Sequence, residues 1–200
     1  MWWKSQKSNG NAVEYIIVGL GNPGLSYERT RHNAGMMALA VLAGRAGVKL
    51  DRAKFKSLTA QCTLCGVRVL LMAPQTYMNN SGEAVTEAMR FYKLPPERVV
   101  VLQDDISLAV GAVRVRRKGS DGGQKGLRSI ITLSGSEAFP RVKIGVGAKP
   151  HPDYDLSKWV LSNFTKEEQP LMETACETAA NAAECIVQGK IDEAMNRFSH

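Results

Sequence analysis

The chain has 200 residues, of which 44% are hydrophobic and 22% charged, and its formal net charge is +7. This composition predicts one folded domain and excludes a disordered chain; because no run of about 18 apolar residues occurs, it also excludes a membrane-spanning helix. The charge is uneven, since seven acids and three bases between 166 and 200 leave +11 on residues 1–165.

Apolar periodicity and turn residues predict the elements of the first half. They are a strand at 15–19, a helix at 33–47, a hairpin of strands at 58–64 and 67–73, a helix at 80–92 and a buried strand at 99–102. The first helix follows from helical spacing of small and apolar residues between Met37 and Gly44. For the second helix, Asn80 and Glu83 have the spacing of a capping box.

In the second half of the chain, the same patterns predict a half-exposed strand at 113–116, a short helix at 127–133, a strand at 141–146 and a long helix at 166–188. Strands that alternate with helices indicate the α/β class, here one domain over 15–200 whose twisted mixed sheet is flanked by helices. Residues 1–14 are a polar N-terminal extension, whose order the sequence leaves open, without the apolar stretch of a signal peptide.

Six basic residues lie within fifteen positions, with Asp121 the only acid among them: Arg114, Arg116, Arg117, Lys118, Lys125 and Arg128. Such a concentrated field favours a polyanion, and a phosphate backbone is the most common one. A solvated surface without a partner is the alternative, and composition alone does not separate the two.

The four cysteines do not have the pattern of a disulfide framework or a zinc site. Cys62 and Cys65 belong to a predicted strand, where odd spacing directs side chains to opposite faces, and Cys176 and Cys185 lie on opposite sides of a predicted helix. No second C-x-x-C or histidine pair completes a ligand set. We expect reduced cysteines in a cytoplasmic protein without metal or other cofactor.

The loop at 19–24 reads G-L-G-N-P-G and satisfies the G-x-G-x-x-G pattern of dinucleotide-binding proteins. Pro23, however, removes a backbone amide from the loop, and residues 26–30 intervene before the helix. The second strand also ends at Leu64 without an acid for a ribose. These features disfavour a nucleotide cofactor.

Five segments follow one another in a specific order. They are Tyr15–Gly35 with G-L-G-N-P-G and T-R-H-N-A-G, Q-T-Y-M-N-N-S-G at 75–82, Asp104-Asp105, G-G-Q-K-G-L at 122–127, and R-V-K-I-G-V-G at 141–147. Together they resemble the bacterial peptidyl-tRNA hydrolases, over about Tyr15 to Arg197. The resemblance implies a monomeric enzyme that cleaves the ester between a peptide and the terminal ribose of tRNA, with peptidyl-tRNA rather than DNA as its partner.

Three histidines are available for proton transfer near neutral pH. His200 is terminal, and His151 lies in a proline-flanked loop with no nucleophile nearby in sequence. His32 lies where a polar loop meets the first helix, whose N-terminus favours a neutral imidazole. Its context alone is typical of a surface residue or a cap, whereas the resemblance implies that His32 is the general base.

Asp104 follows a buried strand, at the edge of the sheet where α/β sites collect. By itself it reads as a cap, and the resemblance implies that it orients His32 and stabilises the imidazolium. Asp105 is left without a catalytic role. Asn22 reads as a turn residue, and the resemblance implies that its amide discriminates N-blocked substrates from free aminoacyl-tRNA.

The resemblance also implies substrate-binding residues. Tyr27 and Tyr77 would contact the end of the tRNA and Asn79 the peptide and scissile bond, with Met78 as a further candidate; packing at the rim is the competing reading for these side chains.

Arg116 and Lys143 would hold phosphates, where the family usually has lysine and arginine in the opposite order. The exchange keeps the charge but changes the geometry of the contact.

One motif departs from the family, which usually reads G-G-H-N-G-L where this chain has Gln124 and Lys125. Gln124 cannot act as a base but can donate a hydrogen bond, and Lys125 suits a phosphate or an oxyanion. The departure leaves open an alternative, a catalytically silent RNA-binding relative, although the retained His32 and Asp104 favour an active enzyme.

Overall fold

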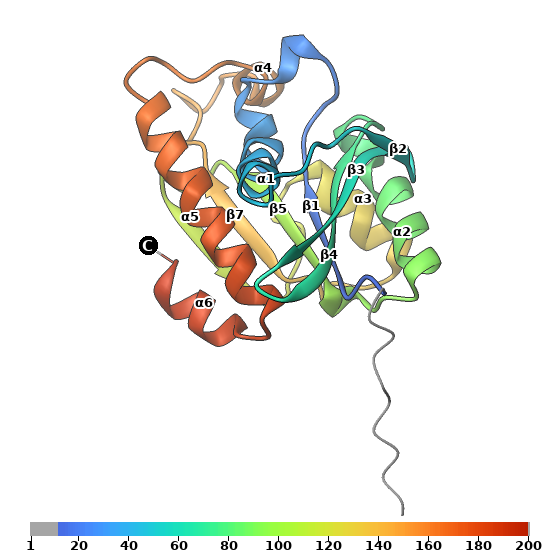
Figure 1. The fold of residues 1–200 in the computed structure, drawn as a ribbon. Coiled ribbons are helices and arrows are strands. Elements are labelled where there is room, and N and C mark those ends of the chain that lie inside the picture. Colours follow the sequence, from blue (N-terminus) through green and yellow to red (C-terminus); the bar gives the residue numbers. More distant parts are fainter. Residues whose placement is uncertain (1–11, 200) are drawn as a thin grey trace, which may run out of the picture.

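A twisted sheet of seven strands forms the middle layer of the protein (Figure 1). The computed structural model describes residues 12–199 and has the strand order β2-β3-β4-β1-β5-β7-β6. The four central strands β4, β1, β5 and β7 are parallel, whereas β2, β3 and β6 run antiparallel to their neighbours. Their bounds are β1 Tyr15–Gly19, β2 Arg52–Lys54, β3 Ser57–Leu64, β4 Val67–Pro74, β5 Val99–Asp105, β6 Val113–Arg116 and β7 Arg141–Gly145.

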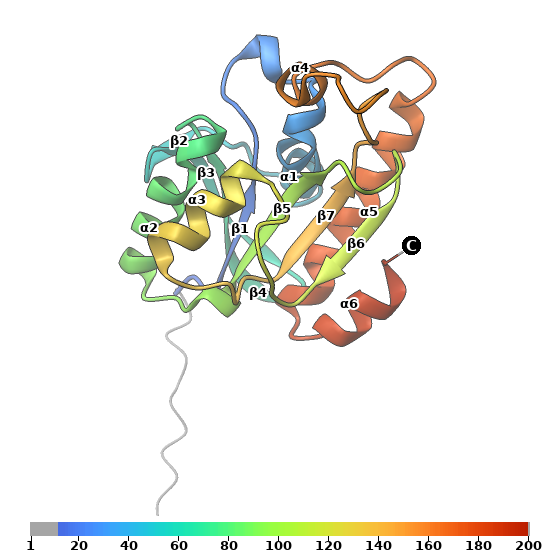
Figure 2. The same cartoon turned by 180° about the vertical axis from the view of Figure 1, so that it is seen from behind.

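Helices cover both faces of the sheet. Helices α1 and α5 pack on one face and α2 and α3 on the other, as the two opposite views show (Figures 1 and 2). The helices are α1 Ala34–Arg45, α2 Ser81–Tyr92, α3 Lys125–Ser134, α4 Leu156–Val160, α5 Gln169–Val187 and α6 Ile191–Arg197, with short 3-10 turns η1 Leu25–Tyr27, η2 Arg31–Asn33, η3 Met78–Asn80 and η4 Pro96–Arg98.

Strand β1 is buried along its whole length because it has a parallel neighbour on each side and a helical layer on each face. Its side chains alternate between two hydrophobic cores: Ile17 packs in the core under α1 and α5, and Ile16 and Val18 pack in the core under α2 and α3. Packing begins before β1, since Val13 is buried and the Glu14 amide donates to the Arg68 carbonyl.

The predicted α/β class and mixed sheet are confirmed, and the predicted elements are present with ends shifted by at most three residues. The capping box is wrong. Asn80 precedes α2, but its side chain makes no cap hydrogen bond, and Glu83 instead pairs with Lys56 across the surface. The short elements β2, α4 and α6 were not predicted, because three to seven residues carry too little periodicity to be recognised.

The four cysteines are free thiols. Cys62 is buried on β3, whereas Cys65 lies beyond the strand, exposed in the turn that follows it. Cys176 and Cys185 are both buried although they lie on opposite sides of α5, because α5 contacts α1, the sheet and α6. Burial raises the pKa of the Cys176 thiol to about 12, which keeps it protonated.

Within residues 12–199, no helix is both long and apolar enough to cross a membrane. The first eleven residues of the predicted N-terminal extension, and His200, lie outside the described range.

The topology places the carboxyl ends of β1 and β5 side by side at a switch point. The chain leaves β1 toward β4 on one side, and it leaves β5 toward β6 and β7 on the other. The connections therefore diverge, and a cleft is expected above the two strand ends. The loop after β1 carries Asn22, and β5 ends with Asp104 and Asp105.

Helix α1 approaches these two strands so closely that its second residue must be glycine. A Cβ on Gly35 would lie 2.2 Å from the Leu102 carbonyl oxygen and 2.7 Å from the Leu20 amide nitrogen. Both neighbours are backbone atoms, so they cannot rotate away. This contact fixes the distance between the start of α1 and the middle of β5.

We predict that Gly35→Ala lowers the free energy of unfolding by at least about 1–3 kcal/mol, because α1 must move away from the sheet. Gly44→Ala in the same helix is the matched control, since a Cβ there meets nothing within 4 Å. The control should gain about 0.5–1 kcal/mol, as alanine favours helix. Urea denaturation of both variants measures the difference, and equal stabilities would contradict the close-approach argument.

Candidate active site

A cavity of about 430 Å³ opens above the carboxyl ends of β1 and β5. Its lining combines polar side chains, glycine backbone and one apolar wall, from Asn22, His32, Met78, Asn79, Gln103, Asp104, Asp105, Ile106, Gly122, Gly123, Gln124, Lys125, Leu156, Ser157, Val160 and Leu161. The cavity is lined by five predicted site residues, namely Asn22, His32, Asn79, Asp104 and Lys125, together with the candidates Met78 and Gln124.

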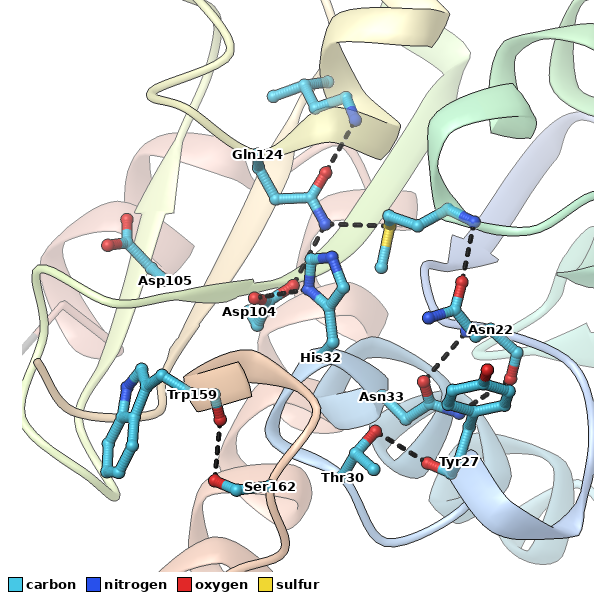
Figure 3. A network of polar contacts seen from close by, with 12 residues as sticks. Asn22, Tyr27, Thr30, His32, Asn33, Asp104, Asp105, Gln124, Trp159 and Ser162 are labelled. Atoms are coloured by element: carbon cyan, nitrogen blue, oxygen red, sulfur yellow. Dashed lines mark hydrogen bonds and ion pairs between the residues drawn. The ribbon is translucent and has the colours of Figure 1, made fainter. Parts of the chain in front are cut away.

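His32 and Asp104 form a hydrogen-bonded pair in the cavity (Figure 3). His32 lies in η2, two residues before α1 begins, and its Nδ1 is 2.8 Å from Oδ2 of Asp104 near the end of β5. The His32 residue is 9% exposed and Asp104 is 3% exposed. A carboxylate only accepts hydrogen bonds, so Nδ1 of the neutral ring carries the proton. Nε2 is then left as an acceptor, which is the arrangement that a general base requires.

The second oxygen of Asp104 is also engaged. Oδ1 accepts a hydrogen bond from Nε2 of Gln124 at 3.0 Å, and Oε1 of Gln124 accepts from the Leu127 amide at 2.8 Å. Gln124 thereby serves as the N-cap of α3. Asp105, the next residue on β5, points away from this group (Figure 3).

Asn22 presents the NH₂ group of its side chain to the cavity. Its Oδ1 accepts a hydrogen bond from the Met78 amide at 2.8 Å, while its backbone exchanges two hydrogen bonds with the side chain of Asn33. Because the oxygen is occupied, the side chain of Asn22 is oriented with the NH₂ group on the His32 side (Figure 3). Sequence reasoning missed Asn33, although it lies in the T-R-H-N-A-G motif.

The two predicted tyrosines contact each other but are not among the residues that line the cavity. Tyr27 and Tyr77 make an edge-to-face contact with ring centroids 6.5 Å apart, and Tyr77 is 56% exposed. Tyr77 has φ of 49°, a left-handed conformation that costs free energy in a non-glycine residue. It directly precedes Met78 and Asn79, so the strained backbone leads into the cavity wall.

The predicted phosphate ligands lie on the antiparallel pair β6 and β7. Arg114 is opposite Lys143, and Arg116 is opposite Arg141, so these side chains share one face. Arg116 is exposed, whereas Arg141 is buried and donates to the carbonyl groups of Gly119, Ser120, Glu137 and Phe139. Arg141 is therefore a structural arginine and Arg116 an accessible one.

Lys143 is paired with Asp105, with Nζ 2.7 Å from Oδ2. Burial alone would raise the pKa of Asp105, but hydrogen bonds from Lys143 and from Ser107 outweigh it and lower the pKa. Asp105 is thus ionised at neutral pH, and an anion that binds Lys143 must compete with it. The sequence shows both charged residues, but it does not show that the side chains of Lys143 and Asp105 lie next to each other.

A buried arginine beside the base was not predicted as a site residue. Arg31 is 2% exposed, and its guanidinium donates to both carboxylate oxygens of Glu168, at 2.7 and 3.1 Å, and to the Val146 carbonyl at 2.8 Å. The guanidinium carbon also lies 3.8 Å from the ring centroid of Trp159, in α4.

Helix α4 supplies the apolar wall of the cavity. Leu156 and Leu161 are 43% and 41% exposed, and both line the cavity with Val160. Arg31 also connects the segment around α4 to η2, since its backbone amide donates a hydrogen bond to the Ser162 carbonyl at 3.0 Å. Asp155, which caps α4, is a sequence signal that could have located the helix.

We predict that Glu168→Gln lowers the free energy of unfolding by about 1–3 kcal/mol at pH 7, because the buried Arg31 loses its counter-charge. Burial alone would raise the pKa of Glu168, but hydrogen bonds from Arg31 and from the Thr165 amide hold the pKa below its usual value.

A lowered pKa in the folded state stabilises the protein above the unfolded pKa of about 4.3, and the contribution is lost as the pH falls through the folded value. The stability gap between wild type and Glu168→Gln should therefore close in acid. Glu167→Gln, in the exposed neighbouring residue, is the control. Denaturant melts between pH 3 and 7 measure the gap, and a gap that is constant with pH would refute the ion-pair explanation.

Comparisons with known proteins agree on one family. The peptidyl-tRNA hydrolase family profile matches residues 16–200. Peptidyl-tRNA hydrolases of Caldicellulosiruptor bescii and Caldanaerobacter subterraneus are 48% and 50% identical to the chain, over 92% of its length and 96% and 99% of theirs. The crystal structure of peptidyl-tRNA hydrolase from Acinetobacter baumannii superposes with a TM-score of 0.87 at 35% identity, covering 92% of this chain and 94% of that one. The chain belongs to the peptidyl-tRNA hydrolase family.

Proposed function

We propose that this protein hydrolyses peptidyl-tRNA at the ester bond between the peptide and the terminal ribose, and so recycles tRNA. The observation that carries the proposal is the 2.8 Å hydrogen bond between His32 and Asp104 in the cavity. It leaves Nε2 of a neutral imidazole free to take a proton from water. Family membership supports the same activity and the same substrate.

In the proposed reaction, Nε2 of His32 removes a proton from a water molecule as its oxygen attacks the ester carbonyl. Asp104 stabilises the imidazolium that forms. The tetrahedral intermediate carries an oxyanion, for which Asn79 and Lys125 are the candidate donors. When the intermediate collapses, the C–O bond to the ribose breaks, and the ribose oxygen takes the proton from His32. The products are the peptide with a free carboxyl group and the intact tRNA.

Asn22 is assigned to substrate selection. Its free NH₂ group can donate to a peptide carbonyl, whereas its oxygen is occupied by the Met78 amide. A free α-ammonium is therefore offered a donor rather than an acceptor. This arrangement favours N-blocked substrates over aminoacyl-tRNA.

The tRNA is assigned to Tyr27 and Tyr77 and to the basic residues of β6 and β7. The two tyrosines offer aromatic surface to the terminal nucleotides, Arg116 attracts a phosphate, and a phosphate at Lys143 competes with Asp105. Such contacts do not depend on base sequence. We further propose that the enzyme acts in the cytoplasm as a monomer, and that tRNA rather than DNA is its nucleic-acid partner.

We predict that His32→Ala lowers kcat by about 10²–10⁴-fold, because the attacking water loses its base. Asp104→Asn should have a similar effect, since an amide can hydrogen-bond the wrong tautomer of the ring. His151→Ala, in an exposed histidine outside the cavity, is the control and should retain wild-type activity. The assay measures tRNA released from N-acetyl-aminoacyl-tRNA.

The same assay decides between this proposal and the alternative of a silent RNA-binding relative. Tight tRNA binding by the wild-type protein without release of tRNA would favour the alternative. Full activity in His32→Ala would contradict the assigned base.

We also predict that Arg116→Ala weakens tRNA binding and lowers the slope of log K against log salt by about one, because one phosphate contact is lost. The control is Arg90→Ala in α2, which removes an exposed charge on the other half of the molecule. Filter binding at several salt concentrations measures both slopes. Identical slopes for the two variants would remove Arg116 from the binding site.

A further inference from the structure

The side chain of Gln124 connects the N-terminus of α3 to the carboxylate behind the base. It is 7% exposed and forms two hydrogen bonds of opposite kind, accepting from the Leu127 amide at 2.8 Å and donating to Asp104 at 3.0 Å. Its Nε2 also lies 3.0 Å from Sδ of Met78. Each polar atom of the amide thus has a partner within the protein.

The helix end determines which way this amide faces. The Leu127 N–H belongs to the first turn of α3, where no backbone acceptor is available, so it needs a side-chain oxygen. With Oε1 in that place, Nε2 must face Asp104. The reversed amide would direct its NH₂ group at the Leu127 N–H and its oxygen at a carboxylate, so both contacts would become repulsive.

The fixed amide in turn orients the carboxylate. With Oδ1 of Asp104 held by Gln124, Oδ2 is directed at Nδ1 of His32. Asp104 is 3% exposed, so water has little access to replace a lost partner. An unfilled acceptor at this depth is costly, and the carboxylate would rotate to satisfy it.

We propose that Gln124 is a positioning residue, whose amide, oriented by the end of α3, holds Asp104 in the rotamer that keeps Nδ1 of His32 protonated and Nε2 available. The kinetic part of this inference rests on the proposed function. Gln124 does not contact the reacting atoms and acts only through Asp104. It stays neutral at every pH, so it supplies this hydrogen bond throughout the working range.

Two variants separate the hydrogen bond to Asp104 from the cap of α3. Gln124→Ser keeps an oxygen that can cap the Leu127 amide, but its side chain is too short to reach Asp104. Gln124→Met is neutral and of similar length, and it loses both contacts. An effect common to both variants therefore belongs to the lost donor, rather than to a weakened helix end.

We expect kcat to fall about 10- to 100-fold in both variants at pH 7, the range expected for loss of one hydrogen bond to a charged group. KM should stay within about threefold, because Gln124 acts through Asp104 on the chemical step rather than on substrate binding. The melting temperature should stay near the wild-type value in Gln124→Ser, which keeps the cap, and be lowered in Gln124→Met. Gln124→His, which carries an N–H donor, should keep most of kcat.

A second measurement does not depend on activity. The chain has three histidines, so the ring N–H signal of His32 is identified in ¹H–¹⁵N spectra by comparison with His32→Ala. In the wild type this proton is held by Asp104 and should exchange slowly with water. In Gln124→Ser and Gln124→Met it should broaden or disappear.

A Gln124→Ser protein with wild-type kcat and a wild-type ring N–H signal overturns the inference. So does a fall in kcat seen only in variants that also melt earlier, since that pattern belongs to a structural cap. An inactive wild type would instead refute the proposed function. In that case the ring signal still tests whether Gln124 positions the pair.

Discussion

The hydrogen bond between the His32 ring and the Asp104 carboxylate joins two residues that are 72 positions apart in the chain. It exists because β1 and β5 are adjacent parallel strands and because Gly35 lets α1 approach β5 at backbone contact. Both partners are largely excluded from water, where an unpaired charge or polar atom would be costly. The rest of the site is arranged around this one contact.

Three supports hold the pair from different directions. Gln124 donates a hydrogen bond to Oδ1 of Asp104. Arg31 connects η2, which carries His32, to the segment around α4, and Asn33 connects the start of α1 to the loop that carries Asn22. In each support the donors and acceptors are matched, so each side chain has one favourable orientation. A site built in this way needs little rearrangement when charge develops in the reaction.

The electrostatics of the site divide between its interior and its rim. In the interior, the Lys143 and Asp105 side chains neutralise one another. The uncompensated positive charge lies on Arg114 and Arg116 along the edge of β6, and on Lys125, which borders the cavity at the start of α3. This distribution suits a substrate whose phosphates remain in solvent while its ester enters the cavity.

Local patterns in the sequence were sufficient for the element types, the hairpin, the α/β class and the family resemblance, because each depends on residues close together in the chain. His32, Asp104 and Asn22 were identified through motifs of that kind. The tertiary structure alone decided what each side chain contacts. Glu83 pairs with Lys56 instead of capping α2, Lys143 is held by Asp105, and Gln124 faces Asp104. These contacts depend on strand order and helix placement, which bring together residues that no local spacing connects.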